Sequence, residues 1–94
     1  MTQAIERGAL RAFFLPYAEQ AHRASERVHI IHARGLSRHG AGYVCEVNEA
    51  AVAKYSDGSN STTWIAFAEI VALEVCDING RCFRAFTVTD GGAA

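Results

Sequence analysis

Histidine, glutamate and cysteine side chains are the groups in this chain that could bind a metal or act as a nucleophile. His22, Glu26 and His29 follow one another at spacings of four and three residues. If residues 17–33 formed one helix, these side chains would share a face and could act as two imidazole ligands and one carboxylate ligand. If a strand begins near Arg27, the set separates. Neighbouring arginines also disfavour a bound cation, so we predict no metal site and no cofactor, with these three residues as the weak candidates.

The three cysteines could supply a nucleophilic thiol. Cys45 lies in an alternating segment, and His39 could serve as its base. The sequence offers no third residue to orient that histidine, and a buried cysteine usually acts as a small apolar side chain. We therefore expect no catalytic residue and no enzymatic activity. A small Cys/His enzyme is the second alternative.

Arginines are concentrated in the first part of the chain. Residues 1–40 carry six arginines, three glutamates and all four histidines, and the two parts have net charges of about +3 and −4. The guanidinium groups could contact nucleic-acid phosphates without reading a base sequence; the candidates are Arg23, Arg27, Arg34 and Arg38. A nucleic-acid-binding small β-barrel that uses residues 23–38 is therefore the first alternative function.

Residues 62–89 predict a β-hairpin. Two apolar runs flank the segment 77–81, in which Asn79-Gly80 is typical of a two-residue hairpin loop. Such a loop pairs Cys76 with Phe83, and Asp77 with Cys82. Cys76 and Cys82 would then point to opposite faces of the sheet, so we expect reduced thiols rather than a disulfide.

The two faces of this predicted hairpin differ. One face is strongly apolar and suits a core; it consists of Val71, Leu73, Val75, Phe86 and Val88. Near the turn on this face, Asp77 and Arg84 lie diagonally and could form a surface ion pair. The other face is more apolar than contact with water requires; it consists of Ile70, Ala72, Glu74, Cys76, Ile78, Phe83 and Ala85. Either another part of the chain covers it, or it is an interface.

Residues 1–94 are expected to fold as one domain of the α+β class. The helical part covers residues 2–26, with a stop or kink at Pro16, an antiparallel β part covers residues 27–89, and residues 90–94 fray. Residues 27–34 suit a helix or a strand, and their β-branched side chains favour a strand. Four to six strands would form a curved antiparallel sheet that packs on the helix and could close into a small barrel.

These features predict a small non-enzymatic interaction domain. Its partner would be a protein or a second copy of the chain, and a phage or mobile-element inhibitor or regulator of a host complex is one setting that suits it. We assign partner contacts to Arg23, Arg27, Arg34, Arg38, Glu74, Ile78 and Phe83. The longest apolar stretch is too short to span a bilayer and the first residues do not resemble a secretory signal, so we expect a cytoplasmic location without membrane contact.

Overall fold

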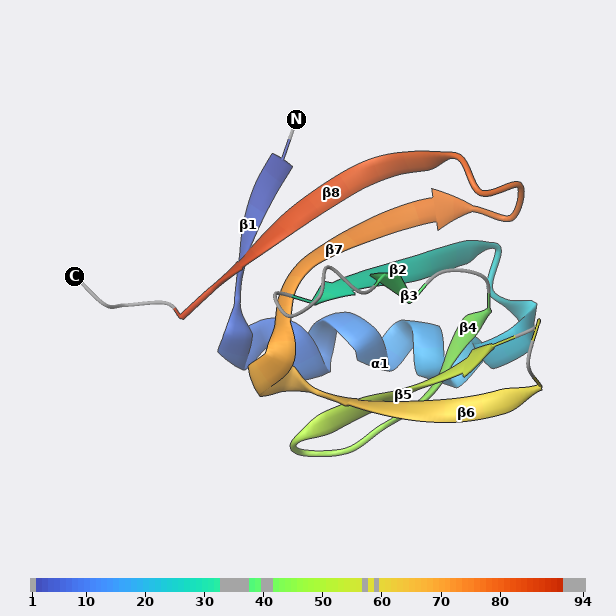
Figure 1. Ribbon diagram of the computed structural model, residues 1–94, viewed down its shortest axis with the longest axis horizontal. Helices are drawn as coiled ribbons and strands as arrows, with labels where there is room; N and C mark the ends of the chain where they lie inside the picture. The colour runs from blue at the N-terminus through green and yellow to red at the C-terminus, as the bar shows by residue number, and fades with distance from the viewer. Residues whose placement is uncertain (1, 33–37, 40–41, 57, 59, 91–94) are drawn as a thin grey trace.

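The computed structural model of the chain describes residues 2–32, 38–39, 42–56, 58 and 60–90. These residues form one α-helix and eight β-strands, and the strands belong to two sheets of five and three strands (Figure 1). The fold is therefore of the α+β class, as the sequence predicts. The strands outnumber the four to six that we expected, and closure into a small barrel is not confirmed.

The larger sheet holds residues 70–89 of the predicted hairpin at its centre, whereas residues 62–66 of the predicted range belong to the smaller sheet. Its strand order is β1 (Thr2–Glu6), β8 (Cys82–Thr89), β7 (Ile70–Asp77), β2 (Glu26–His32) and β3 (Arg38–His39). The β8–β7, β7–β2 and β2–β3 pairs are antiparallel. The strand that we favoured for residues 27–34 is confirmed as far as His32, and Arg34 lies outside the described residues.

Strand β1 corrects the prediction of a helix from residue 2 onward. Residues Thr2–Glu6 pair in parallel with β8, from Thr2 opposite Ala85 to Glu6 opposite Thr89. Ile5 packs against the core from this edge position. The helical spacing of the apolar residues is only a local preference, and a long-range strand pairing overrides it.

Helix α1 (Leu10–Gln20) runs through Pro16 and ends where Ala21 takes a φ of 49°. It is shorter than the helical part that we predicted, since β2 already begins at Glu26. Figure 1 shows α1 between the large sheet and the small sheet, which contains β4 (Tyr43–Val47), β5 (Ala51–Ser56) and β6 (Ser61–Ala66). Both neighbouring pairs of the small sheet are antiparallel.

The core lies between the helix and the two sheets. Leu10 and Phe14 of α1 are fully buried, and Phe14 stacks on Phe67 at the start of the 3-10 turn Phe67–Glu69 that joins β6 to β7. From the larger sheet, the predicted apolar hairpin face supplies the buried residues Leu73, Val75, Phe86 and Val88. The orientation of the hairpin towards the core is therefore confirmed.

Arg7, which lies just before α1, links three segments that are far apart in the sequence. Its guanidinium donates to the backbone carbonyls of Phe67 and Ile70, and its Nε donates to Asp90 Oδ1 at 2.7 Å. Buried carbonyls at the turn between the sheets thus gain a charged donor. This contact fixes the end of β8 beside the start of the helix.

The hairpin turn differs from the predicted two-residue loop. Gly80 N–H donates to Asp77 O and Asp77 N–H donates to Arg81 O, which closes a three-residue loop with Gly80 at a φ of 86°. The Asp77 carboxylate accepts from the N–H groups of Asn79 and Arg81, both at 2.9 Å, and so stabilises this longer turn.

The longer loop overturns our expectation about the cysteines. It places Cys76 directly opposite Cys82, and the two form a disulfide. Phe83 is then the extra residue of a β-bulge, beyond which Val75 faces Arg84 as predicted. The error in the predicted register is therefore confined to the end of the hairpin.

Candidate functional site

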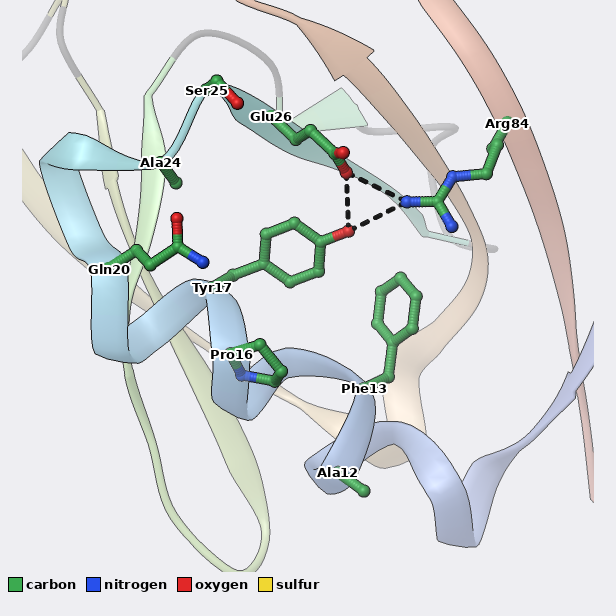
Figure 2. A pocket seen from close by; sticks show the side chains of 9 residues that line it. All are labelled: Ala12, Phe13, Pro16, Tyr17, Gln20, Ala24, Ser25, Glu26 and Arg84. Atoms are coloured by element: carbon green, nitrogen blue, oxygen red, sulfur yellow. Dashed lines mark hydrogen bonds and ion pairs between the residues drawn. The ribbon is translucent and has the colours of Figure 1, made fainter.

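A surface hollow of about 500 Å³ lies where the outer side of α1 meets the start of β2 and the middle of β8. Apolar groups of the helix and a few polar groups line it; the residues are Ala12, Phe13, Pro16, Tyr17, Gln20, Ala24, Ser25, Glu26 and Arg84 (Figure 2). A concave, mixed lining of this kind suits a ligand side chain or a peptide segment.

Tyr17, Glu26 and Arg84 form a hydrogen-bonded triangle at one end of the hollow. Tyr17 Oη donates to Glu26 Oε1 at 3.1 Å, and Arg84 Nη2 donates to Glu26 Oε1 at 2.9 Å and to Tyr17 Oη at 3.2 Å (Figure 2). The expected partner of Arg84 was Asp77, but Asp77 Oδ1 accepts from the turn and Glu26 takes the ion pair. The guanidinium and carboxylate side chains are 44% and 39% exposed, so the pair contributes at most about 1 kcal/mol to stability.

The environment of Tyr17 raises the pKa of its phenol above the ordinary value near 10. Partial burial is the main cause, and the neighbouring Glu26 carboxylate adds to it, while the Arg84 guanidinium acts in the opposite direction. Tyr17 therefore remains a neutral hydrogen-bond donor at physiological pH.

We expect the tyrosinate absorbance titration of the folded chain to contain a component above pH 10 that is absent from Tyr17→Phe. Because the folded-state pKa is raised, the contribution of Tyr17 to stability is full below the unfolded pKa and is lost as the pH rises through the folded pKa. The free energy of unfolding of the wild type should accordingly fall more steeply above pH 10 than that of Tyr17→Phe. Equal titration curves for the two proteins would contradict the assignment.

Arg84 also connects the hollow to the end of the hairpin. Its Cζ atom lies 5.6 Å from the ring centroid of Phe83 and 6.0 Å from that of Phe86. Phe86 is buried, whereas Phe83 is 53% exposed. One guanidinium therefore joins an exposed aromatic ring, a core ring and the polar end of the hollow. We call the hollow, Arg84 and Phe83 together the hairpin–helix surface.

The structure separates the weak metal candidates of the sequence. His22 lies in the 3-10 turn Ala21–Arg23, exposed beside the Tyr43 ring, and the Glu26 carboxylate is paired with Arg84. His29 instead has its Nδ1 at 3.6 Å from Cys76 Sγ. The sequence reasoning missed this neighbour because the contact depends on the long-range pairing of β2 with β7.

Only part of the arginine-containing segment 23–38 lies within the described residues. Arg23 is exposed, and Arg27 donates to Ala24 O with its guanidinium 6.0 Å from the Tyr43 ring centroid. Arg34 and the side chain of Arg38 lie outside the described residues. The guanidinium of Arg27 is therefore occupied within the chain, which weakens the argument for a phosphate-binding row.

The other residues assigned to partner contacts belong to the hairpin. Ile78 is 68% exposed at the loop, and Glu74 is half-buried on β7. Ile70 and Cys76, which we placed on the outward face, are fully buried. Large apolar exposure on this hairpin is thus concentrated at its end, in Ile78 and Phe83.

Cys45 has the environment of a structural thiol. Its Sγ donates to Ala53 O at 3.6 Å, and burial, with a smaller contribution from Glu46, raises the pKa of the thiol. A raised pKa leaves less thiolate at neutral pH, which is unfavourable for a nucleophile. The side chain of His39, the base considered for it, lies outside the described residues.

No helix in the described part of the chain is long and apolar enough to cross a membrane. A comparison of the chain with protein-family models, with curated proteins and with solved structures found no match.

Proposed function

We propose that the chain is a non-enzymatic protein-binding domain that engages its partner through the hairpin–helix surface. The observation that carries this proposal is the exposure of Phe83, 53%, at the bulge next to Arg84. A bulge residue fills neither a core position nor a required turn position. The fold therefore has no use for a phenyl ring there, whereas a partner could bury it.

The neighbouring groups support the same function. Arginine, tyrosine and phenylalanine are enriched in protein interfaces, and here Arg84, Tyr17 and Phe83 are contiguous. Tyr17, Glu26 and Arg84 hold one another in place, so their polar atoms are ordered before a partner arrives. Ile78 adds a second exposed apolar side chain at the end of the same hairpin.

The partner that fits this surface is a protein segment that inserts an apolar side chain into the hollow and packs on Phe83. The hollow has an apolar wall from α1 and a charged pair at one end, which suits a segment with one apolar and one polar contact. A second copy of the chain is the alternative occupant. The phage or mobile-element setting stays a prediction.

Site-specific photocrosslinking in cells of the source organism tests this function. A benzophenone amino acid at position 83 should yield an adduct of discrete mass, and the same probe at Thr63, which is exposed on β6 of the other sheet, should not. An adduct of twice the chain mass would identify a second copy as the partner.

A matched pair of alanine-to-arginine substitutions makes the test specific to the hollow. Ala12→Arg fills the hollow from an exposed position and should abolish the adduct, whereas Ala68→Arg, at an exposed position outside the hollow, should leave it unchanged. Adducts of equal yield from positions 83 and 63, no adduct at all, or an adduct unaffected by Ala12→Arg would overturn the proposed surface.

A further inference from the structure

The disulfide at the end of the hairpin lies beside an imidazole, and the three side chains together offer ligand atoms that could hold a metal ion. The ligand atoms of His29, Cys76 and Cys82 all lie within 4.8 Å of one another. Each comes from a different strand of the larger sheet, β2, β7 and β8, which are hydrogen-bonded neighbours. The site is therefore built on adjacent strands rather than on flexible loops.

Strand register explains why these three side chains meet. Cys76 lies opposite Cys82 on one side and opposite Arg27 on the other, and His29 lies two residues along β2 from Arg27. Residues at this diagonal spacing share a face of the sheet and are within reach of a long side chain. The face is the one opposite the core cluster, which contains their strand neighbours Val28 and Val75, and it is covered at this point, since Cys76 is itself fully buried.

We propose that the reduced chain binds one Zn²⁺ ion between the Cys76 and Cys82 thiolates and the His29 imidazole. Soft thiolates and imidazole are the ligands that Zn²⁺ prefers, and two thiolates neutralise its charge. The ion and the disulfide exclude each other, because both need the same two sulfur atoms. The site is thus a metal site whose occupancy depends on the redox state.

A thiol–disulfide couple supplies and removes the electrons that break and reform the Cys76–Cys82 bond. A dithiol reduces the Cys76–Cys82 bond to two thiols and becomes a cyclic disulfide itself. Binding of Zn²⁺ then releases two protons, one from each thiol. A small-molecule disulfide reverses both steps: it reforms the Cys76–Cys82 bond, becomes two thiols with the uptake of two protons, and the ion leaves.

After reduction of the disulfide, the geometry permits tetrahedral coordination of the ion. With Zn–S bonds of about 2.3 Å, the two sulfurs of such a site lie roughly 3.8 Å apart, and the histidine nitrogen lies at a similar distance from each. His29 Nδ1 is already 3.6 Å from Cys76 Sγ. Cys82 is at the surface, so rotation of its side chain can separate the sulfurs, and water can occupy the fourth position.

Arg27 is the cation nearest in register, since it lies opposite Cys76. Its guanidinium donates to Ala24 O and lies 6.0 Å from the ring centroid of Tyr43, near the start of β4. The positive charge is therefore held by other groups.

Cobalt spectroscopy of the full chain tests the site. The chain is reduced with a dithiol, freed of it by gel filtration under argon, and titrated with Co²⁺. We expect thiolate-to-cobalt charge-transfer absorption and tetrahedral d–d bands that saturate at one equivalent and are bleached by Zn²⁺. The oxidised chain should show neither band.

Variants assign the ligands. Cys76→Ser and Cys82→Ser should lose the charge-transfer absorption, and His29→Gln should weaken Co²⁺ binding at least tenfold. Cys45→Ser and His22→Gln are the matched controls, because Cys45 is the free cysteine and His22 is exposed in another segment; both should bind like the wild type.

A second measurement needs no substitution in the site. In the reduced wild type, Zn²⁺ should protect the exposed Cys82 from alkylation at least tenfold and leave the alkylation rate of Cys45 unchanged, as peptide mass spectrometry would report. Absence of the cobalt bands, an unchanged affinity in His29→Gln, or equal alkylation of Cys82 with and without Zn²⁺ would each overturn the proposed site.

Discussion

Replacing Phe14 with alanine is expected to lower the free energy of unfolding by about 3–5 kcal/mol. The Phe14 side chain is fully buried, its ring stacks on Phe67 with centroids 6.1 Å apart, and it meets Phe13 edge-to-face at 5.3 Å. Truncation removes these contacts and leaves a cavity between α1 and the turn that joins the two sheets. A chain of this length is stable by only about 5–14 kcal/mol, so the loss removes a large part of the margin.

Equilibrium unfolding in urea measures the effect. The midpoint should fall with little change in the slope of the unfolding free energy against urea concentration. Phe83→Ala is the matched control, since it removes the same ring from a position that is 53% exposed and should change stability by less than about 1 kcal/mol. If the two variants were equally stable, the core described here would be wrong.

Substituting alanine for Gly42 is expected to destabilise the chain by about 3 kcal/mol or more. Gly42 has a φ of 136°, which side chains rarely adopt, and a Cβ atom there would lie 1.8 Å from the backbone oxygen of Tyr55. Tyr55 pairs with Tyr43 at the first position of the β4–β5 ladder. The clash is with backbone, so relief requires β4 to move away from β5.

Gly8→Ala is the control for this substitution. A Cβ atom at Gly8 meets no other atom within 4 Å, and its φ lies outside the left-handed region. The change should be neutral or should stabilise by up to about 1 kcal/mol, because alanine lowers the entropy of the unfolded chain. A thermal unfolding midpoint of Gly42→Ala close to that of Gly8→Ala would show that β4 and β5 do not approach as described.

Local sequence patterns predict the fold correctly where burial and strand pairing favour the same secondary structure as the pattern does. The β-branched run in residues 27–32 forms a strand, and the alternation in residues 71–75 and 84–88 identifies the buried face of the hairpin. Residues 2–6 mislead, because their apolar spacing suits a helix, whereas their actual partner is β8, more than eighty residues later. No local pattern reports such a pairing.

The candidate sites are likewise predicted only in part by the sequence. The sequence places Ile78 and Phe83 on an apolar outward face, and the structure finds both exposed. It cannot show that Tyr17, Glu26 and Arg84 meet, since three separate elements must pack before they do. The disulfide depends on one extra loop residue, which the Asp77 carboxylate stabilises through two hydrogen bonds that residue types alone do not reveal.

The parallel pairing of β1 with β8 has a consequence for synthesis on the ribosome. Residues Thr2–Glu6 emerge from the exit tunnel long before the strand that binds them has been translated. The nascent chain must therefore keep this segment unpaired until β8 is being translated, and closing so long a loop slows the docking of β1. A chain interrupted before Ala85 would present two unpaired strands at once, β1 and the outer edge of β7, and both would be open to pairing with other nascent chains.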